Sequence, residues 1–153
     1  MVFVTVGTQK QSFRRLFLVL ENSEVLNNDT IIVQAGHTNF NSSKMNIYSF
    51  MELETLRKYI KESEFVICHG GVGSIFDALL AGKKVLAVPR LAKYGEHIND
   101  HQLEICLELE RLGYIKVYDE SRPFDLVVKE LRSTDLKKYE TDYSFIDKLR
   151  KEI

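Results

Sequence analysis

Short apolar runs alternate with segments of helical periodicity along the chain, and this alternation restricts the fold more than any other feature. The run at residues 65–68 is continuously apolar, which is typical of a strand covered on both faces. Strands are predicted at residues 1–6, 30–34, 45–49, 65–68, 84–88 and 115–118. Helices are predicted at residues 12–20, 52–62, 73–81, 97–112, 124–131 and 143–153. This order predicts an α/β domain with an open, mostly parallel sheet and right-handed crossovers.

The composition fits one such domain and excludes several classes of function. The 153 residues, 44% of them hydrophobic, suffice to bury a core without disulfides or a structural metal. The 21 basic and 22 acidic side chains leave a net charge of -1, which provides no field for nucleic acid or an anionic bilayer. No apolar run approaches the roughly 20 residues that span a membrane, and the first residues lack the basic start of a signal peptide. We therefore expect a single soluble domain, residues 1–153, with no nucleic-acid partner.

The cysteines and histidines form no recognisable metal or disulfide pattern. Cys68 and Cys106 both lie in apolar surroundings, without CxxC spacing, which is typical of inert thiols in a reducing cytosol. The four histidines do not follow a metal-ligand spacing, and no cysteine joins them. The sequence therefore predicts no metal site.

Three glycines follow the apolar run at 65–68 and lead straight into the helix predicted at 73–81. Such a turn presents unpaired backbone N–H groups, and the positive end of the helix dipole, at the carboxyl edge of the sheet. Glycines let a ligand approach the backbone closely, so the turn suits a phosphate or pyrophosphate. Ser74 can add a hydroxyl donor, and Asp77, one helical turn after Gly73, can accept hydrogen bonds from ribose.

Other interpretations of this segment stay open. The glycine spacing matches neither GxGxxG nor the P-loop, which disfavours a dinucleotide-dependent oxidoreductase and an NTPase. A tight turn whose glycines serve packing alone is the remaining alternative. Arg90 follows the strand predicted at 84–88, where it either faces the charge of a bound phosphate or is a solvated loop cation.

These motifs resemble the C-terminal, nucleotide-sugar-binding domain of family-28 glycosyltransferases of GT-B fold. The resemblance extends from residues 4–9 to the helix that begins near His97. It is closest to short members whose donor-binding half is a separate polypeptide, among them bacterial capsule and exopolysaccharide transferase subunits and the eukaryotic dolichol-linked GlcNAc transferase. It implies a Rossmann-like open parallel sheet with helices on both faces, equivalent to the C-terminal half of a GT-B enzyme.

The resemblance assigns binding roles to the residues that match the family's motifs. The H-x-G-x-G-S turn, which holds the donor's diphosphate, corresponds to His69, Gly70, Gly71, Gly73 and Ser74. Asp77 stands where relatives place an acidic residue on the ribose. The motif that contacts the donor sugar corresponds to Asn99, Asp100, His101 and Gln102. Gly7 and Thr8 match the first glycine turn, which together with Arg90 is expected to line the cleft.

Two departures from the family leave the donor sugar open. Many relatives have Asp where this chain has His101, and the stretch between Pro89 and Gln102 is longer than usual. His97 and His101 either cap the helix or contact the sugar. Galactose, N-acetylglucosamine and glucuronic acid are all compatible with residues 99–102.

In function, the resemblance implies the catalytic, donor-binding subunit of a two-chain inverting glycosyltransferase. This enzyme would move a hexose-type sugar from a UDP-sugar to a polyprenyl-diphosphate-linked acceptor in surface polysaccharide biosynthesis, without a metal or cofactor. The general base is expected on a membrane-associated, acceptor-binding partner subunit. That partner would recruit the cytoplasmic chain to the inner face of the membrane, with residues 143–153 contributing to the interface. The alternative is a non-catalytic UDP-sugar-binding sensor or scaffold.

Overall fold

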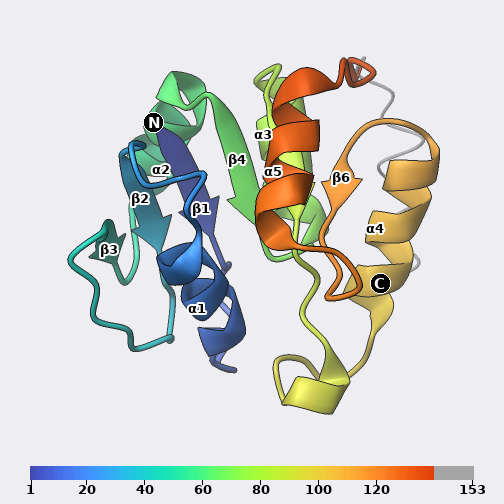
Figure 1. The fold of residues 1–153 in the computed structure, drawn as a ribbon. Helices are drawn as coiled ribbons and strands as arrows, with labels where there is room; N and C mark the ends of the chain where they lie inside the picture. The colour runs from blue at the N-terminus through green and yellow to red at the C-terminus, as the bar shows by residue number, and fades with distance from the viewer. Residues whose placement is uncertain (140–153) are drawn as a thin grey trace.

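Parallel strands form an open sheet in the computed structural model, which describes residues 1–139 (Figure 1). The strands are β1 (Val2–Thr5), β2 (Ile31–Gln34), β3 (Met45–Tyr48), β4 (Phe65–Cys68), β5 (Lys84–Ala87) and β6 (Lys116–Val117). They lie in the order β3-β2-β1-β4-β5-β6, and every neighbouring pair is parallel. The predicted Rossmann-like parallel sheet is thus confirmed, and β4 has the predicted bounds.

The helices follow the strands in the predicted order. They are α1 (Arg14–Asn22), α2 (Leu53–Glu62), α3 (Val72–Leu80), α4 (His101–Arg111) and α5 (Phe124–Ser133), with a short 3₁₀ turn at Ala92–Tyr94. The helix predicted at 143–153 lies outside the described residues. The longest helix described within residues 1–139 has 11 residues, and none of those helices can span a membrane.

The helix boundaries differ from the prediction by up to two residues, except that α4 begins at His101, four residues after the predicted start at 97. Side chains in the preceding loop bind the backbone in its place. The Asn99 N–H donates to His97 Nδ1 over 3.2 Å, and the His101 N–H donates to Asn99 Oδ1 over 3.1 Å. Such local bonds compete with helix formation. Ile98, whose spacing predicts a helix face packed on the core, is instead 82% exposed in this loop.

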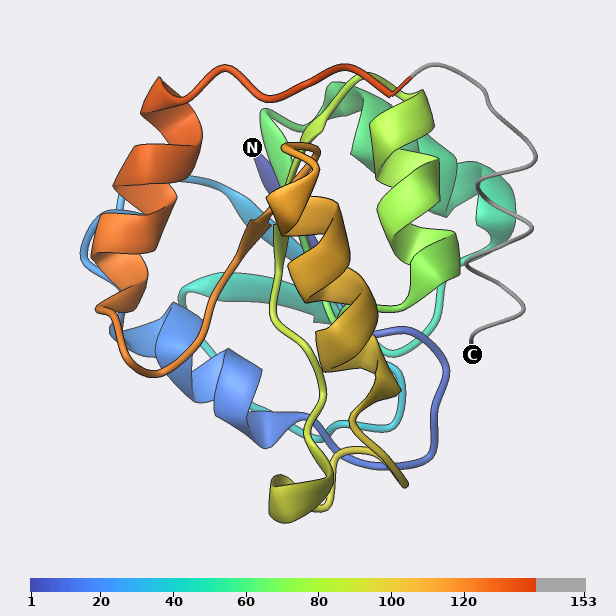
Figure 2. The same cartoon turned by 90° about the vertical axis from the view of Figure 1, so that its right-hand side faces the viewer.

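Apolar side chains cover both faces of the sheet, as a doubly wound sheet requires. Alternate residues of β1 point to opposite faces: Val2 and Val4 pack with α1 and α5, whereas Phe3 packs with α2, α3 and α4. Figure 2 shows the same division, with α1 and α5 on the left and α3 on the right. The protein therefore has two core layers, one on each side of the sheet.

The strand order reverses direction between β1 and β4, and this point positions the site. The two strands are paired in register, so that Thr5 and Cys68 lie side by side where they end. Consequently the loops after both strands start at the same place on the carboxyl edge, while their helices go to opposite faces. Ligands of open α/β sheets bind in the crevice at such a switch point.

Candidate functional site: the glycine turn at the sheet switch point

His69 fills the space between the loop after β1 and the loop after β4. Its side chain is buried, with the residue only 6% exposed. A Cβ atom placed on Gly7 would lie 2.6 Å from His69 Nε2, and one on Gly71 would lie 2.3 Å from His69 Cε1. Gly7 also has a φ of +74°, which other residues rarely adopt. Both glycines are therefore required for the ring to pack against the two turns.

The environment keeps the His69 ring neutral at ordinary pH. Its pKa is lowered to about 3, chiefly by burial and then by the nearby positive charge of Arg90, while the Gln102 side chain acts in the opposite direction. The ring edge faces the start of α3, where Ser74 Oγ lies 3.5 Å from His69 Nε2. A neutral imidazole shapes the turn and can offer one N–H group, but it brings no positive charge to a bound anion.

The start of α3 supplies donors for an anion. Helix α3 begins at Val72, and its N-cap residue, Gly71, has no side chain that could cap the first turn. The first N–H groups of a helix have no partner inside it, and they carry the positive end of its dipole. Gly73 is exposed, with open space around its Cβ position, and Ser74 is half-buried in the same turn. This geometry can hold a phosphate or diphosphate through backbone N–H groups and one hydroxyl.

The residues predicted to contact the donor sugar lie together at the start of α4, and three of them accept a backbone hydrogen bond through one side-chain oxygen. Gln102 is buried, and its Oε1 accepts from the Arg90 N–H over 3.2 Å. Asp100 accepts from the Ala92 N–H over 2.9 Å. Asn99 and His101 form the loop hydrogen bond given above, and the buried Nδ1 of His101 has no hydrogen-bond partner among residues 1–139. The side chains of Asn99, Asp100 and Gln102 therefore shape the loop before α4.

Arg90 is buried rather than facing open solvent, with 1% of the residue exposed. Its guanidinium donates to the carbonyl oxygens of Val6 over 2.8 Å, Gln11 over 2.8 Å and Glu96 over 3.1 Å, and it stacks over the Phe13 ring. Burial lowers the pKa of Arg90 to about 10, against the opposing effect of Glu96, so the group stays charged. Arg90 therefore ties the loops after β1 and β5 together.

Thr8 and Asp77 flank the turn at different distances. Thr8 is exposed directly after Gly7. Asp77 lies on the second turn of α3, about 6 Å along the helix from Gly73. There it lines a pocket of about 370 Å³ with Arg57 and Lys61 of α2. The structure thus brings Gly7 and residues 69–74 together, whereas the pocket lined by Asp77 is formed by α2 and the end of α3 and contains none of those residues.

Two charged residues at this edge were missed by the sequence-based prediction. Arg15, at the start of α1, donates to both carboxylate oxygens of Glu96, over 3.0 and 2.9 Å. Glu96 is only 3% exposed. Nothing in the sequence distinguishes this pair from surface charges, because the partners are 81 residues apart and no spacing rule joins them.

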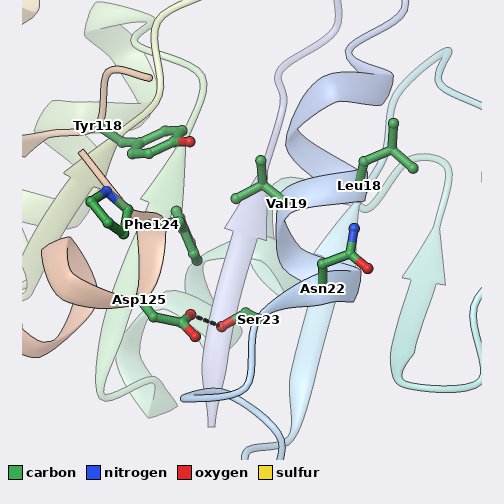
Figure 3. A pocket seen from close by; sticks show the side chains of 8 residues that line it. Leu18, Val19, Asn22, Ser23, Tyr118, Phe124 and Asp125 are labelled. Carbon is green, nitrogen blue, oxygen red and sulfur yellow. Dashed lines mark hydrogen bonds between the residues drawn. The ribbon is translucent and has the colours of Figure 1, made fainter. Parts of the chain in front are cut away.

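A separate pocket of about 350 Å³ lies between α1 and α5, away from the glycine turn (Figure 3). Leu18 and Val19 of α1 line one side, and Tyr118 and Phe124 line the other. The Asp125 carboxylate at its floor already accepts from the Ser23 hydroxyl over 2.5 Å and from the Glu24 N–H. The Asn22 amide and the Tyr118 hydroxyl also line this pocket, which shares no residue with the glycine turn.

Among residues 1–139, no three His, Cys, Asp or Glu side chains gather as metal ligands. Cys68 and Cys106 are both free and buried. Burial raises the pKa of Cys68 to about 12 and that of Cys106 well above its ordinary value. Neither thiol is a candidate nucleophile or ligand, because the thiolate is the reactive form.

The strand order and the helix that starts at the switch point define a doubly wound α/β domain with a Rossmann-like parallel sheet. The family model of the glycosyltransferase family 28 C-terminal domain matches residues 1–151, and the chain belongs to this family.

Solved structures show the same fold. The glycosyltransferase of kitacinnamycin matches 99% of the chain with a TM-score of 0.63 and 16% identity, and the calicheamicin glycosyltransferase CalG4 matches 99% with a TM-score of 0.61 and 12% identity. The chain covers 37% of each of these proteins. It therefore corresponds to a little over a third of each of these glycosyltransferases.

Curated relatives carry the name UDP-N-acetylglucosamine transferase subunit ALG13. The protein from Candida albicans is 30% identical over 52% of this chain, the one from Homo sapiens 29% over 74%, and the one from Debaryomyces hansenii 28% over 72%. The matches cover 26%, 10% and 45% of those relatives, respectively, so the chain spans less than half the length of each.

Proposed function

We propose that this chain is the donor-binding, catalytic subunit of a two-chain inverting glycosyltransferase. It binds a UDP-sugar and, with a membrane-associated partner subunit, moves a hexose-type sugar to a polyprenyl-diphosphate-linked saccharide in surface polysaccharide biosynthesis. The observation that carries the proposal is the uncapped N-terminus of α3 at the sheet switch point, beside Ser74 and the neutral His69 ring. The family membership supports the same chemistry.

The residues of this chain act on the donor in the proposed reaction. The diphosphate lies against the first turn of α3, where N–H groups of residues 71–74 and the Ser74 hydroxyl donate to it. Asp77 accepts from the ribose, and residues 99–102 border the sugar. When the acceptor hydroxyl attacks the anomeric carbon, the bond to UDP breaks and negative charge grows on the leaving diphosphate. Fixed backbone donors stabilise this charge without reorganisation, and the proposed mechanism uses no metal.

The partner completes the site. This chain represents one half of the GT-B architecture, and the general base that removes the acceptor proton is assigned to the other half. The partner also holds the cytoplasmic chain at the inner face of the membrane. The relatives' name includes the word subunit, which supports a second chain, and it names N-acetylglucosamine, which makes UDP-N-acetylglucosamine the first donor to test.

Calorimetric titration with UDP tests the donor site. The wild-type chain should bind UDP in the presence of EDTA, and the Ser74→Ala/Asp77→Ala variant should bind it at least tenfold more weakly, because a hydroxyl donor and a carboxylate acceptor are lost. The matched control is Ser133→Ala/Asp135→Ala, which changes the same residue types at exposed positions. Binding that is absent from the wild type, or equal in both double variants, would refute the proposal.

A transfer assay separates the enzyme from the alternative function. The chain is co-purified with its membrane-associated partner and supplied with a lipid-linked acceptor and a panel of UDP-sugars. Transfer of one sugar, with inversion at the anomeric carbon, is the expected result. UDP-sugar binding without transfer to any acceptor in the panel would favour a non-catalytic sensor or scaffold instead.

A further inference from the structure

The loop that precedes α4 projects beyond the carboxyl edge of the sheet, and its shape depends on one buried ion pair. Both views show residues 89–100 extending past the strand ends (Figures 1 and 2). The loop has only a single 3₁₀ turn, at Ala92–Tyr94, and Ile98 within it is 82% exposed. Its apolar packing is therefore limited, so polar contacts must hold it in place.

Those contacts converge on Glu96. Its carboxylate receives two hydrogen bonds from the Arg15 guanidinium, over 2.9 and 3.0 Å, and a third from the Leu91 N–H over 3.1 Å. Arg15 also donates to the carbonyl oxygen of Pro89 over 3.0 Å. A paired, two-point contact between guanidinium and carboxylate fixes orientation as well as distance. One end of the loop is thus bound to α1.

The backbone of Glu96 is bound as well. Its carbonyl oxygen accepts from Arg90, the same guanidinium that donates to Val6 and Gln11 in the loop after β1. The backbone N–H of Arg90 in turn donates to Gln102 Oε1. An unbroken set of contacts therefore joins α1 and the loop after β1 to the residues at the start of α4.

We infer that Arg15 and Glu96 are positioning residues for the donor sugar, because they fix residues 89–100 and thereby the placement of Asn99–Gln102 beside the glycine turn. This inference rests on the proposed function. Neither residue needs to touch the ligand. Their removal should disturb the sugar end of the site and leave the diphosphate end, which is built on α3, intact.

The first measurement is hydrogen exchange of the free, full-length chain. The reporters are the N–H groups of Ala92 and His101, which donate to Asp100 and Asn99 and make no contact with Glu96 themselves. In Glu96→Gln both should exchange roughly tenfold faster, whereas the amides of α3 should not change. Arg15→Lys keeps the charge and loses the paired contact, and it should give a smaller effect in the same direction.

The second measurement compares the dissociation constants of UDP and UDP-N-acetylglucosamine. In Glu96→Gln the sugar nucleotide should bind about tenfold more weakly, with less than a twofold change for UDP, because a displaced loop costs only the sugar contacts. The matched control is Arg132→Gln. It breaks ion pairs with Asp29 and Glu64, each 3.0 Å long, next to the starts of β2 and β4 at the opposite edge of the sheet. The control should change neither the ratio of the two dissociation constants nor the hydrogen exchange of the Ala92 and His101 N–H groups.

The outcomes separate the two proposals. Equal weakening of UDP and UDP-N-acetylglucosamine, or unchanged exchange at both reporters in Glu96→Gln and Arg15→Lys, would overturn the positioning role while the donor site stands. If Glu96→Gln does not fold, Arg15→Lys carries the same two measurements. A wild-type chain that binds neither nucleotide would refute both the proposed function and the effect of the Arg15–Glu96 pair on ligand binding. The hydrogen-exchange measurement would still decide whether this ion pair orders the loop.

Discussion

Replacing Gly7 by alanine tests the central packing contact of the site, because two separate penalties fall on this residue. Its φ of +74° places an alanine in the left-handed region, which costs about 1–2 kcal/mol. The new Cβ would also lie 2.6 Å from His69 Nε2. The ring is 6% exposed and cannot turn aside into solvent. Forcing an extra methyl into such packing costs about 1–3 kcal/mol, so Gly7→Ala should destabilise the fold by about 2–5 kcal/mol.

Two other glycines separate these penalties experimentally. Gly82 has a φ of +75° and no atom within 4 Å of its Cβ position, so Gly82→Ala pays only the backbone penalty. Alanine also lowers the conformational entropy of the unfolded chain, which offsets part of that penalty and leaves a net cost of about 1 kcal/mol. Gly71 has a φ of -73°, and its Cβ would lie 2.3 Å from His69 Cε1, so Gly71→Ala reports the overlap alone, at about 2–3 kcal/mol.

Urea denaturation of the three variants measures the free energies of unfolding. The penalties of Gly71→Ala and Gly82→Ala should sum roughly to that of Gly7→Ala, and adding His69→Ala to Gly7→Ala should recover part of the loss. If Gly7→Ala is no more destabilising than Gly82→Ala, the His69 ring does not constrain the turn, and our account of the glycines is wrong.

Three further predictions concern other buried groups. The pKa of His69 is lowered to about 3 in the fold, from about 6.5, so the stability that the neutral ring contributes is complete above pH 6.5. The free energy of unfolding should fall by about 1.4 kcal/mol per pH unit as the pH drops from 6.5 toward 3, because the unfolded chain binds the proton first. Urea titrations of His69→Asn over the same pH range should lack this slope. Arg90→Met removes the donor of three carbonyl oxygens and should destabilise the chain by about 3–5 kcal/mol by the same assay, and a loss under 1 kcal/mol would contradict its tying role. Cys68 and Cys106 should resist a thiol reagent in the native chain and react in urea, because burial raises both pKa values; fast native labelling would argue against the described packing.

The local pattern of the sequence was enough to predict the layers of the fold and the position of the glycine turn. The run at 65–68 is apolar at every residue, and it became the buried strand β4 with the same bounds. The glycines after it lead into a helix whose first turn is uncapped. These features depend on neighbours a few residues away, which a sequence displays directly.

The end of the loop before α4 illustrates where local pattern fails. Apolar spacing favoured a helix from residue 97, whereas side-chain bonds within residues 97–101 delay its start to His101. Periodicity records which face of a helix can be buried, but it does not record whether polar side chains bind the backbone first.

Strand, helix and turn preferences act over short distances, so the amino-acid order was enough to predict an α/β domain with a glycine turn before its third helix. The packing of His69 against Gly7, the burial of Arg90 and the contact between Arg15 and Glu96 are found only in the folded chain. Those contacts join segments separated by tens of residues. They exist only because the strand order places β1 next to β4, with the helices that follow the two strands on opposite faces of the sheet. The charge and burial of the site residues follow from the strand order, and the spacing of residues along the chain does not reveal that order.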